Sequence, residues 1–212
     1  MTLLTSPLLD LLRAGPEEAE HEHVLDAALA AFMDFGIRRT TMGEIARRSG
    51  VSPATLYRRF PGKDQLVWAV GRREAARFVA GVDAAVDREA DAESQLVELF
   101  MGFVRGLRQN RLLPRLMATE PEVVLPFLTT QGAPVLVLGR AYLAEVIRRL
   151  QADGHLPVVD PEPAAEMVAR VALSLALTPQ TCIPLDDDEA ARHFARQHVA
   201  ILFGPGRTEL TR

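Results

Sequence analysis

The sequence contains little of the chemistry on which catalysis usually depends. Cys182 is the only cysteine, so the chain can form neither an internal disulfide nor a cysteine cluster that holds zinc. No residue beside it is an evident base that would activate the thiol. The chain also lacks a glycine-rich phosphate-binding loop. No apolar run approaches the ~18 residues that a membrane-spanning helix needs.

The histidines are equally poor candidates for a metal site. His21 with His23, and His193 with His198, lack the i,i+4 spacing that brings two ligands together on a helix. Glu189 and His193 have that spacing, but two ligands are too few. We therefore expect no enzyme, no metal and no cofactor.

The first twenty residues are rich in leucine, but Pro7 and Asp10 interrupt the apolar run. No basic leader and no small-residue cleavage site frame it, so we do not predict a signal peptide. We expect residues 1–20 to form a flexible or helical arm, and the chain to be a soluble protein of the bacterial cytoplasm.

Nearly all of the remaining chain has helical periodicity, and no segment shows sustained alternation of apolar and polar residues. The sequence predicts an all-α fold of about nine helices. Ten candidate segments lie near residues 24–35, 42–49, 53–60, 64–90, 93–110, 113–118, 122–129, 134–152, 163–177 and 187–203. With 212 residues, of which 48% are hydrophobic, the chain can bury a small domain joined to a larger one.

Positive charge is concentrated in one segment of an acidic protein. The net charge is −4, yet residues 21–70 carry +2 and the segments on either side carry −3 each. Between residues 36 and 63 the only acidic residue is Glu44. The basic residues there are Arg38, Arg39, Arg47, Arg48, Arg58, Arg59 and Lys63. Such a local patch favours a polyanion such as duplex DNA as the partner.

The same segment has the signals of two short helices joined by a tight turn. Thr41 and Glu44 have the spacing of a capping box, which would start the first helix. Gly50 suits the left-handed turn after it. Ser52 would cap the second helix, with Pro53 in its first position.

The faces of these two helices can also be assigned. Ile45 and Ala46 are expected to face the core, and Arg47 and Arg48 are expected to face outward. The Val51 side chain should pack into the core between the two helices. In the second helix, Leu56 and Phe60 are the expected anchors, and its small first residues would allow close approach to a groove.

Residues 24–68 closely resemble the DNA-binding domain of the tetracycline-repressor (TetR) family of bacterial transcriptional regulators. The matching residues are Ala31, Phe32, Gly36, Thr40, Thr41, Ile45, Ala46, Gly50, Val51, Ser52, Thr55, Leu56, Tyr57, Phe60, Lys63 and Leu66. The resemblance implies a helix-turn-helix DNA-binding domain at residues 21–66 and a helical ligand-binding and dimerisation domain at residues 67–212.

The resemblance also implies roles for single residues. Thr41, Tyr57 and Lys63 would contact phosphates, and Arg48 is added as an outward-facing DNA contact. The residues expected nearest the bases are Ser52, Pro53, Ala54, Thr55 and Arg58. Arg59 stands where the family often has histidine, so the resemblance does not determine which bases this protein reads.

Two further sites are predicted in the rest of the chain. The expected pocket for a hydrophobic small-molecule effector comprises Phe78, Phe100, Phe103, Val104, Leu107, Met117, Phe127, Tyr142, Val146 and Thr178. The expected homodimer interface comprises Val168, Val171, Ala172, Leu175, Phe194, His198, Val199 and Leu202. These sites predict a repressor that leaves a palindromic operator when it binds ligand. The alternative is a DNA-binding regulator without a small-molecule effector.

Overall fold

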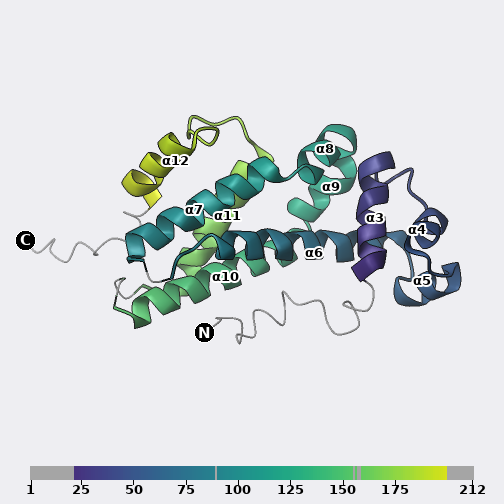
Figure 1. The fold of residues 1–212 in the computed structure, drawn as a ribbon, viewed down its shortest axis with the longest axis horizontal. Helices are drawn as coiled ribbons and strands as arrows, with labels where there is room; N and C mark the ends of the chain where they lie inside the picture. The colour runs from purple at the N-terminus through teal and green to yellow at the C-terminus, as the bar shows by residue number, and fades with distance from the viewer. Residues whose placement is uncertain (1–21, 89, 155, 157–158, 200–212) are drawn as a thin grey trace, which may run out of the picture. The chain divides into compact units, whose positions relative to one another are not determined.

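The computed structural model describes residues 22–88, 90–154, 156 and 159–199, and this part of the chain is helical without a strand (Figure 1). The α-helices are α3 (Glu22–Phe35), α4 (Met42–Ser49), α5 (Pro53–Arg59), α6 (Lys63–Ala84), α7 (Ala92–Gln109), α8 (Leu112–Thr119), α9 (Pro121–Leu128), α10 (Ala133–Ala152), α11 (Pro161–Leu177) and α12 (Asp188–Phe194). A π-helical turn, η1 (Ala195–Val199), follows α12. The all-α prediction is confirmed for the described residues.

Two predicted helices differ from the observed ones. The helix expected to reach residue 90 ends at Ala84, and the N–H groups of Ala85 and Val86 donate to the carbonyls of Val82 and Asp83, three residues earlier, at 3.2 Å each. The Gln95 amide donates to the carbonyls of Ala90 and Arg88 at 2.7 and 3.3 Å. The helix expected at 187–203 appears as α12 and η1, and its last four residues lie outside the described part, as does the arm at 1–20.

The described part of the chain forms two compact units, and the domain boundary expected at residue 66 stays a prediction. The first unit combines the described residues up to Arg77 with Arg111–Val135, and the second combines Phe78–Asn110 with the residues from Leu136 onward. The boundary at Arg77 falls within α6 and the boundary at Val135 falls within α10, whereas the boundary at Asn110 directly follows the end of α7.

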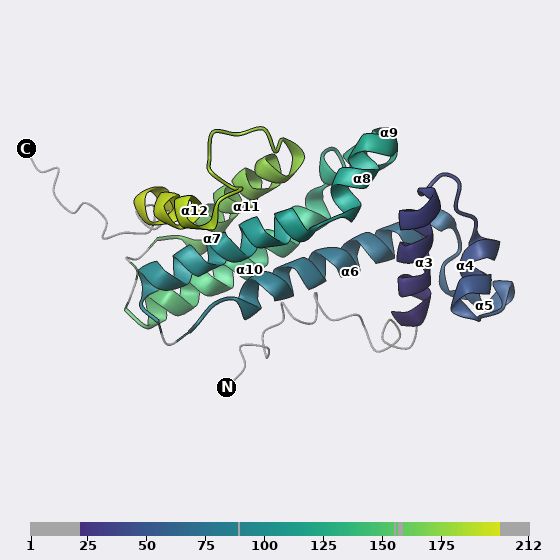
Figure 2. The same cartoon turned by 45° about the horizontal axis from the view of Figure 1, so that its top comes forward.

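In the first unit, helices α3 to α5 and the start of α6 share a core with α8 and α9 (Figure 2). Phe32, Ile45 and Leu56 are fully buried in it, and Leu116 of α8 and Val124 of α9 belong to the same cluster. Trp68 of α6 meets Phe127 of α9 edge to face, with 4.5 Å between the ring centroids. The helices α8 and α9 are therefore part of the unit that contains the predicted DNA-binding segment.

In the second unit, α7 packs on the end of α6 and on α12. At Gly102 of α7 an added Cβ would lie 3.1 Å from the Cα atom of Val82, so glycine permits the close approach of these two helices. Arg105 and Arg108 of α7 both bind the carboxylate of Asp188 at the start of α12. Ion pairs therefore reinforce the apolar contact between α7 and α12.

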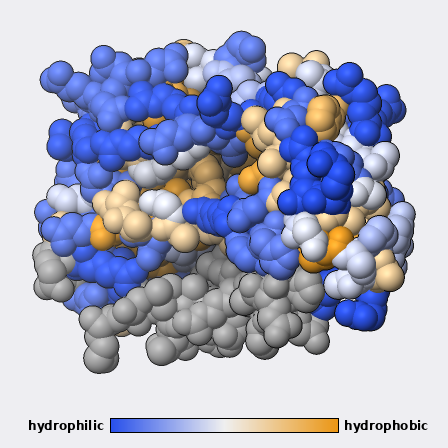
Figure 3. Space-filling view, turned by 45° about the vertical axis from the view of Figure 1, so that its right-hand side comes forward, coloured by the Kyte–Doolittle hydropathy of each residue, from blue (hydrophilic) through white to orange (hydrophobic). Residues whose placement is uncertain are grey.

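The surface view in Figure 3 displays mainly hydrophilic residues, with apolar residues in small groups among them. No single helix of the described segments is long and apolar enough to cross a membrane, and α9 and α10 meet that criterion only as a pair across the break between them.

Candidate nucleic-acid interface

Helix α4 begins and ends as its sequence predicts. The Thr41 hydroxyl accepts a hydrogen bond from the backbone N–H of Glu44 at 3.2 Å. Gly50 ends the helix in the left-handed region, at a φ of 73°. Ile45 and Ala46 are buried. Local caps and one apolar face therefore fix α4 on the core.

Helix α5 presents its first turn to solvent. The Ser52 hydroxyl accepts from the backbone N–H of Thr55 at 3.1 Å, which confirms the predicted cap. Leu56 and Phe60 are buried and anchor the helix. Residues 52–54 are exposed, as are Tyr57, at 51%, and Arg58. The residues predicted to lie nearest DNA thus share the free side of α5, with Thr55 half-buried.

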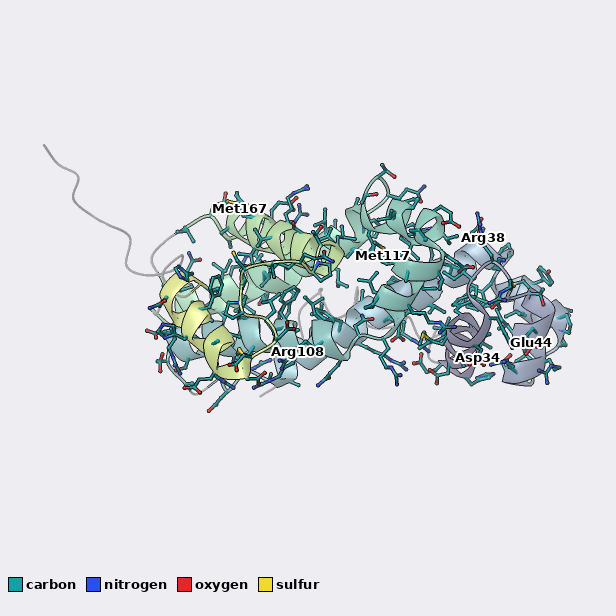
Figure 4. All side chains as sticks on the ribbon, turned by 90° about the horizontal axis from the view of Figure 1, so that it is seen from above. Asp34, Arg38, Glu44, Arg108, Met117 and Met167 are labelled. Atoms are coloured by element: carbon teal, nitrogen blue, oxygen red, sulfur yellow. The ribbon has the colours of Figure 1, made fainter. Side chains whose placement is uncertain are left out.

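The arginines of α4 are paired with carboxylates. Glu44 accepts from Arg47 at 2.8 and 3.0 Å and from Arg48 at 2.7 Å. Arg48 also binds Asp34 at 2.7 Å, and its guanidinium lies 4.9 Å from the centre of the Phe35 ring. Figure 4 labels the two carboxylates, Asp34 and Glu44.

These pairs change the electrostatics of the predicted interface. Hydrogen bonds from Arg47 and then Arg48 lower the pKa of Glu44 from 4.5 to about 2. Arg48 is held against the protein and does not face outward as expected, because two carboxylates and an aromatic ring bind it. Its DNA contact stays a prediction, and a phosphate would have to compete with Glu44 and Asp34.

Lys63 also has partners within the protein. Its ammonium group donates to the carbonyls of Ile37, Arg38 and Thr40 at 3.0, 3.1 and 3.3 Å. It thereby holds the loop that joins α3 to α4. The phosphate contact of Lys63 stays a prediction, beside a structural role that the sequence did not indicate.

The same loop is bound by a residue that sequence reasoning missed. The Glu120 carboxylate, between α8 and α9, accepts from the backbone N–H groups of Ile37 at 2.6 Å and Arg38 at 3.0 Å. Only 8% of Glu120 is exposed. No local signal could have found it, because 83 residues separate it from Ile37.

The structure divides the ten residues of the predicted effector pocket between the two units. Met117 and Phe127 belong to the first unit, and the other eight belong to the second. Within the second unit Phe78 and Phe103 are in edge contact at 5.9 Å, whereas Phe100 packs beside Phe194 of α12 at 5.7 Å.

The two polar residues of the predicted pocket, Tyr142 and Thr178, lie in different environments. The Tyr142 hydroxyl donates to Asp83 at 3.1 Å, and burial raises the pKa of this tyrosine, with the Asp83 charge as the second cause. Thr178 is exposed at the end of α11. The pocket therefore stays a prediction.

The predicted dimer residues of α11 lie partly at its surface. Val171 is 58% exposed, and Met167, which the prediction omitted, is 70% exposed and stands on the outside of α11 (Figure 4). Val168, Ala172 and Leu175 are half-buried.

In α12 and η1, Phe194 and Val199 are half-buried and His198 is exposed, whereas Leu202 lies outside the described residues. The rings of Phe194 and His198 are in contact, with 4.8 Å between their centroids.

Comparison with known proteins gives two family matches and many relatives. The family model "Bacterial regulatory proteins, tetR family" matches residues 24–70, and "Bacterial Tetracyclin repressor, C-terminal domain" matches residues 91–199. An uncharacterised HTH-type transcriptional regulator of Mycobacterium bovis, Mb2274c, is 30% identical over 152 residues, which cover 71% of this chain and 77% of the relative. The transcriptional activator FasR of Mycolicibacterium smegmatis is 35% identical over 113 residues, covering 51% and 52% of the two chains.

The solved structures of two repressors share the fold. The TetR-family repressor AlkX from a Dietzia strain has a TM-score of 0.66 at 22% identity, over 85% of this chain and 96% of that one. The repressor QsdR from R. erythropolis has a TM-score of 0.63 at 21% identity, over 92% and 100% of the two chains.

Proposed function

Because this chain belongs to the tetR family of bacterial regulatory proteins, and is thus a DNA-binding transcriptional regulator and not an enzyme, we propose that it is a ligand-released repressor. It binds a palindromic operator in the cytoplasm as a homodimer, and a hydrophobic small molecule releases it. The observation that carries the proposal is the exposed, capped first turn of α5, which has small residues where a recognition helix approaches base edges.

The length of α5 argues for two copies on one operator. Its seven residues span ~10 Å at ~1.5 Å per residue, which is enough to read only a few base pairs. Each mismatch costs ~1–3 kcal/mol, so one copy discriminates poorly. Two copies held ~34–36 Å apart would read successive turns of the major groove.

Helix α11 offers an apolar surface for the second copy. Met167 and Val171 are four residues apart and therefore lie on one side of the helix. Exposed large side chains at this spacing support a helix-to-helix contact of the kind that forms symmetric dimers.

Helix α6 supplies a route for the effector to act. Its residues Lys63–Arg77 belong to the first unit and its residues Phe78–Ala84 to the second, so this helix connects the two units along the chain. Moving the protein from 99% to 1% DNA-competent requires about 5.5 kcal/mol of differential ligand binding. A ligand held among the apolar side chains of the second unit would supply that difference through α6.

Selection of duplexes from a random pool by the full-length protein tests the DNA-binding part of this proposal. We expect the recovered sequences to share a dyad-symmetric pattern and sedimentation to show two protomers per duplex. Recovered sequences without dyad symmetry, or one protomer per duplex, would contradict the homodimer.

The direction of control needs a separate measurement, because FasR is an activator and the Dietzia AlkX is a repressor. A reporter gene that carries the selected duplex near its promoter should be silenced by the protein. Increased expression would show activation.

A second candidate, a regulator without a small-molecule effector, is favoured by one observation. Tyr142, the predicted polar contact of the ligand, already donates its hydroxyl to Asp83 within the protein. Thermal shift with alkyl compounds separates the candidates. The Dietzia AlkX is implicated in biodegradation of n-alkanes and FadR from Bacillus halodurans is a fatty acid degradation regulator, so n-alkanes and fatty acids are tried first. A rise in melting temperature with loss of DNA binding favours ligand control, and no shift with any compound favours the second candidate.

A further inference from the structure

The loop of residues 36–40, which joins α3 to α4, is held by two side chains of opposite charge from distant parts of the sequence. Glu120 accepts from the N–H groups of Ile37 and Arg38, and Lys63 donates to carbonyls on the same loop. Gly36, Ile37 and Thr40 of this loop are buried, whereas Arg38 and Arg39 are exposed. Because buried backbone groups must find partners, the two side chains favour the loop conformation in which these groups are paired.

Glu120 is itself firmly placed. Its own N–H donates to the Leu116 carbonyl at 2.7 Å, and its carbonyl accepts from Val123 at 3.0 Å, so it joins α8 to α9. Leu116 and Val124, on either side of it, are buried in the core of the first unit. The backbone of Glu120 is therefore fixed in the core of the first unit, and only its side chain could follow the loop if the loop moves.

The contact of Glu120 with the loop requires glycine at position 36. Gly36 has a φ of 80°, in the left-handed region that favours glycine. An added Cβ there would lie 2.9 Å from one carboxylate oxygen of Glu120 and 3.0 Å from the other. The carboxylate thus lies against bare backbone, where a larger residue would push it away from both N–H groups.

We propose that Glu120 is a positioning residue for DNA binding, which sets the loop from which α4 starts. The next residue after the loop is Thr41, the cap of α4 and a predicted phosphate contact. A loop that loses its two bonds to Glu120 frees the start of α4, and the hydrogen-bond geometry toward a phosphate tolerates only a few tenths of an ångström. The inference rests on the family's DNA binding and is independent of repression, dimerisation and effector.

The test compares two charge-removing variants at positions two residues apart, one before α9 and one in its first turn. Glu120→Gln removes one of the two acceptor oxygens at the loop. Glu122→Gln is the matched control, because Glu122 is about half exposed and its carboxylate pairs with the Arg38 side chain at 2.8 Å. Loss of a negative charge beside a DNA-binding surface should by itself strengthen binding.

We expect Glu120→Gln to bind the duplex selected by the wild-type protein at least tenfold more weakly, and Glu122→Gln to bind it as tightly or more tightly. If Glu120 only stabilised the fold, Glu120→Gln would have a lower melting temperature, but the folded variant would bind DNA at low temperature as tightly as the wild type. Equal affinities of Glu120→Gln and Glu122→Gln for this duplex would overturn the proposal.

A measurement on the wild-type protein decides the matter if Glu120→Gln does not fold. Amide hydrogen exchange of Ile37 and Arg38 in the DNA complex should be slow, because both N–H groups remain bonded to Glu120. Fast exchange of both amides in the complex would overturn the proposal. Neither experiment depends on an effector.

Discussion

Replacing Lys63 with methionine separates two roles of this side chain. In the structure its ammonium donates to the carbonyls of Ile37, Arg38 and Thr40, so all three hydrogens are used within the protein. The family resemblance instead assigns it to a DNA phosphate. Methionine keeps the length of the side chain and removes both the charge and the donors.

The cost to stability follows from the three bonds. A hydrogen bond to a charged group is worth ~1.5–3 kcal/mol, but Lys63 is half-buried and the freed carbonyls regain water, so we expect a total loss of about 2 kcal/mol. In a chain of 212 residues this loss lowers the melting temperature by about 4–8 °C.

The effect on DNA is measured from the salt dependence of the affinity for the selected duplex. If Lys63 neutralises a phosphate, its loss makes the slope of log affinity against log salt shallower by ~0.9 per protomer. Arg58→Met is the control, because Arg58 is exposed and its loss should spare the melting temperature. An unchanged melting temperature would refute the loop argument for Lys63, and an unchanged slope would refute its phosphate contact.

Three further predictions concern single residues. The pKa of Glu44 is lowered from 4.5 to about 2 by Arg47 and Arg48, so its stabilising effect is complete above pH 4.5 and is lost as the pH falls toward 2. Glu44→Gln should therefore lose less melting temperature than the wild type on acidification across that range, and an equal loss would contradict the assignment. Thr55→Ala should change which bases are recovered in the duplex selection, and recovery of the wild-type consensus would exclude a role in readout. Met167→Glu places a charge on the exposed side of α11, so the variant should sediment as a folded monomer, and a persisting dimer would place the interface elsewhere.

The parts of this structure that the sequence predicts are those with local causes. The caps at Thr41, Ser52 and Gly50 depend on residues at most four or five positions away, so their signals are contiguous in the chain. Leu56 and Phe60 are one helical turn apart, and this spacing alone places both on the core.

The parts that the sequence could not predict depend on long-range pairing. Glu120 resembles any acidic residue beside a proline until the fold brings it to Ile37. Tyr142 is predicted as a polar contact of the ligand, and the sequence does not indicate its hydrogen bond to Asp83, which lies 59 residues earlier. The assignment of α8 and α9 to the first unit likewise follows from their packing, because their sequences show only that they are helical.

Charge alone does not explain how this surface would recognise a duplex. The count of basic residues in the sequence overstates the charge available to DNA, because Arg48 is bound by Glu44 and Arg38 by Glu122. The tip of α5, residues 52–54, is small and uncharged. A phosphate must exchange with carboxylates to reach the flanking arginines, whereas the tip can approach a groove without losing a partner. We therefore expect the shape of the tip to contribute to discrimination, and the paired arginines mainly to set how strongly binding depends on salt.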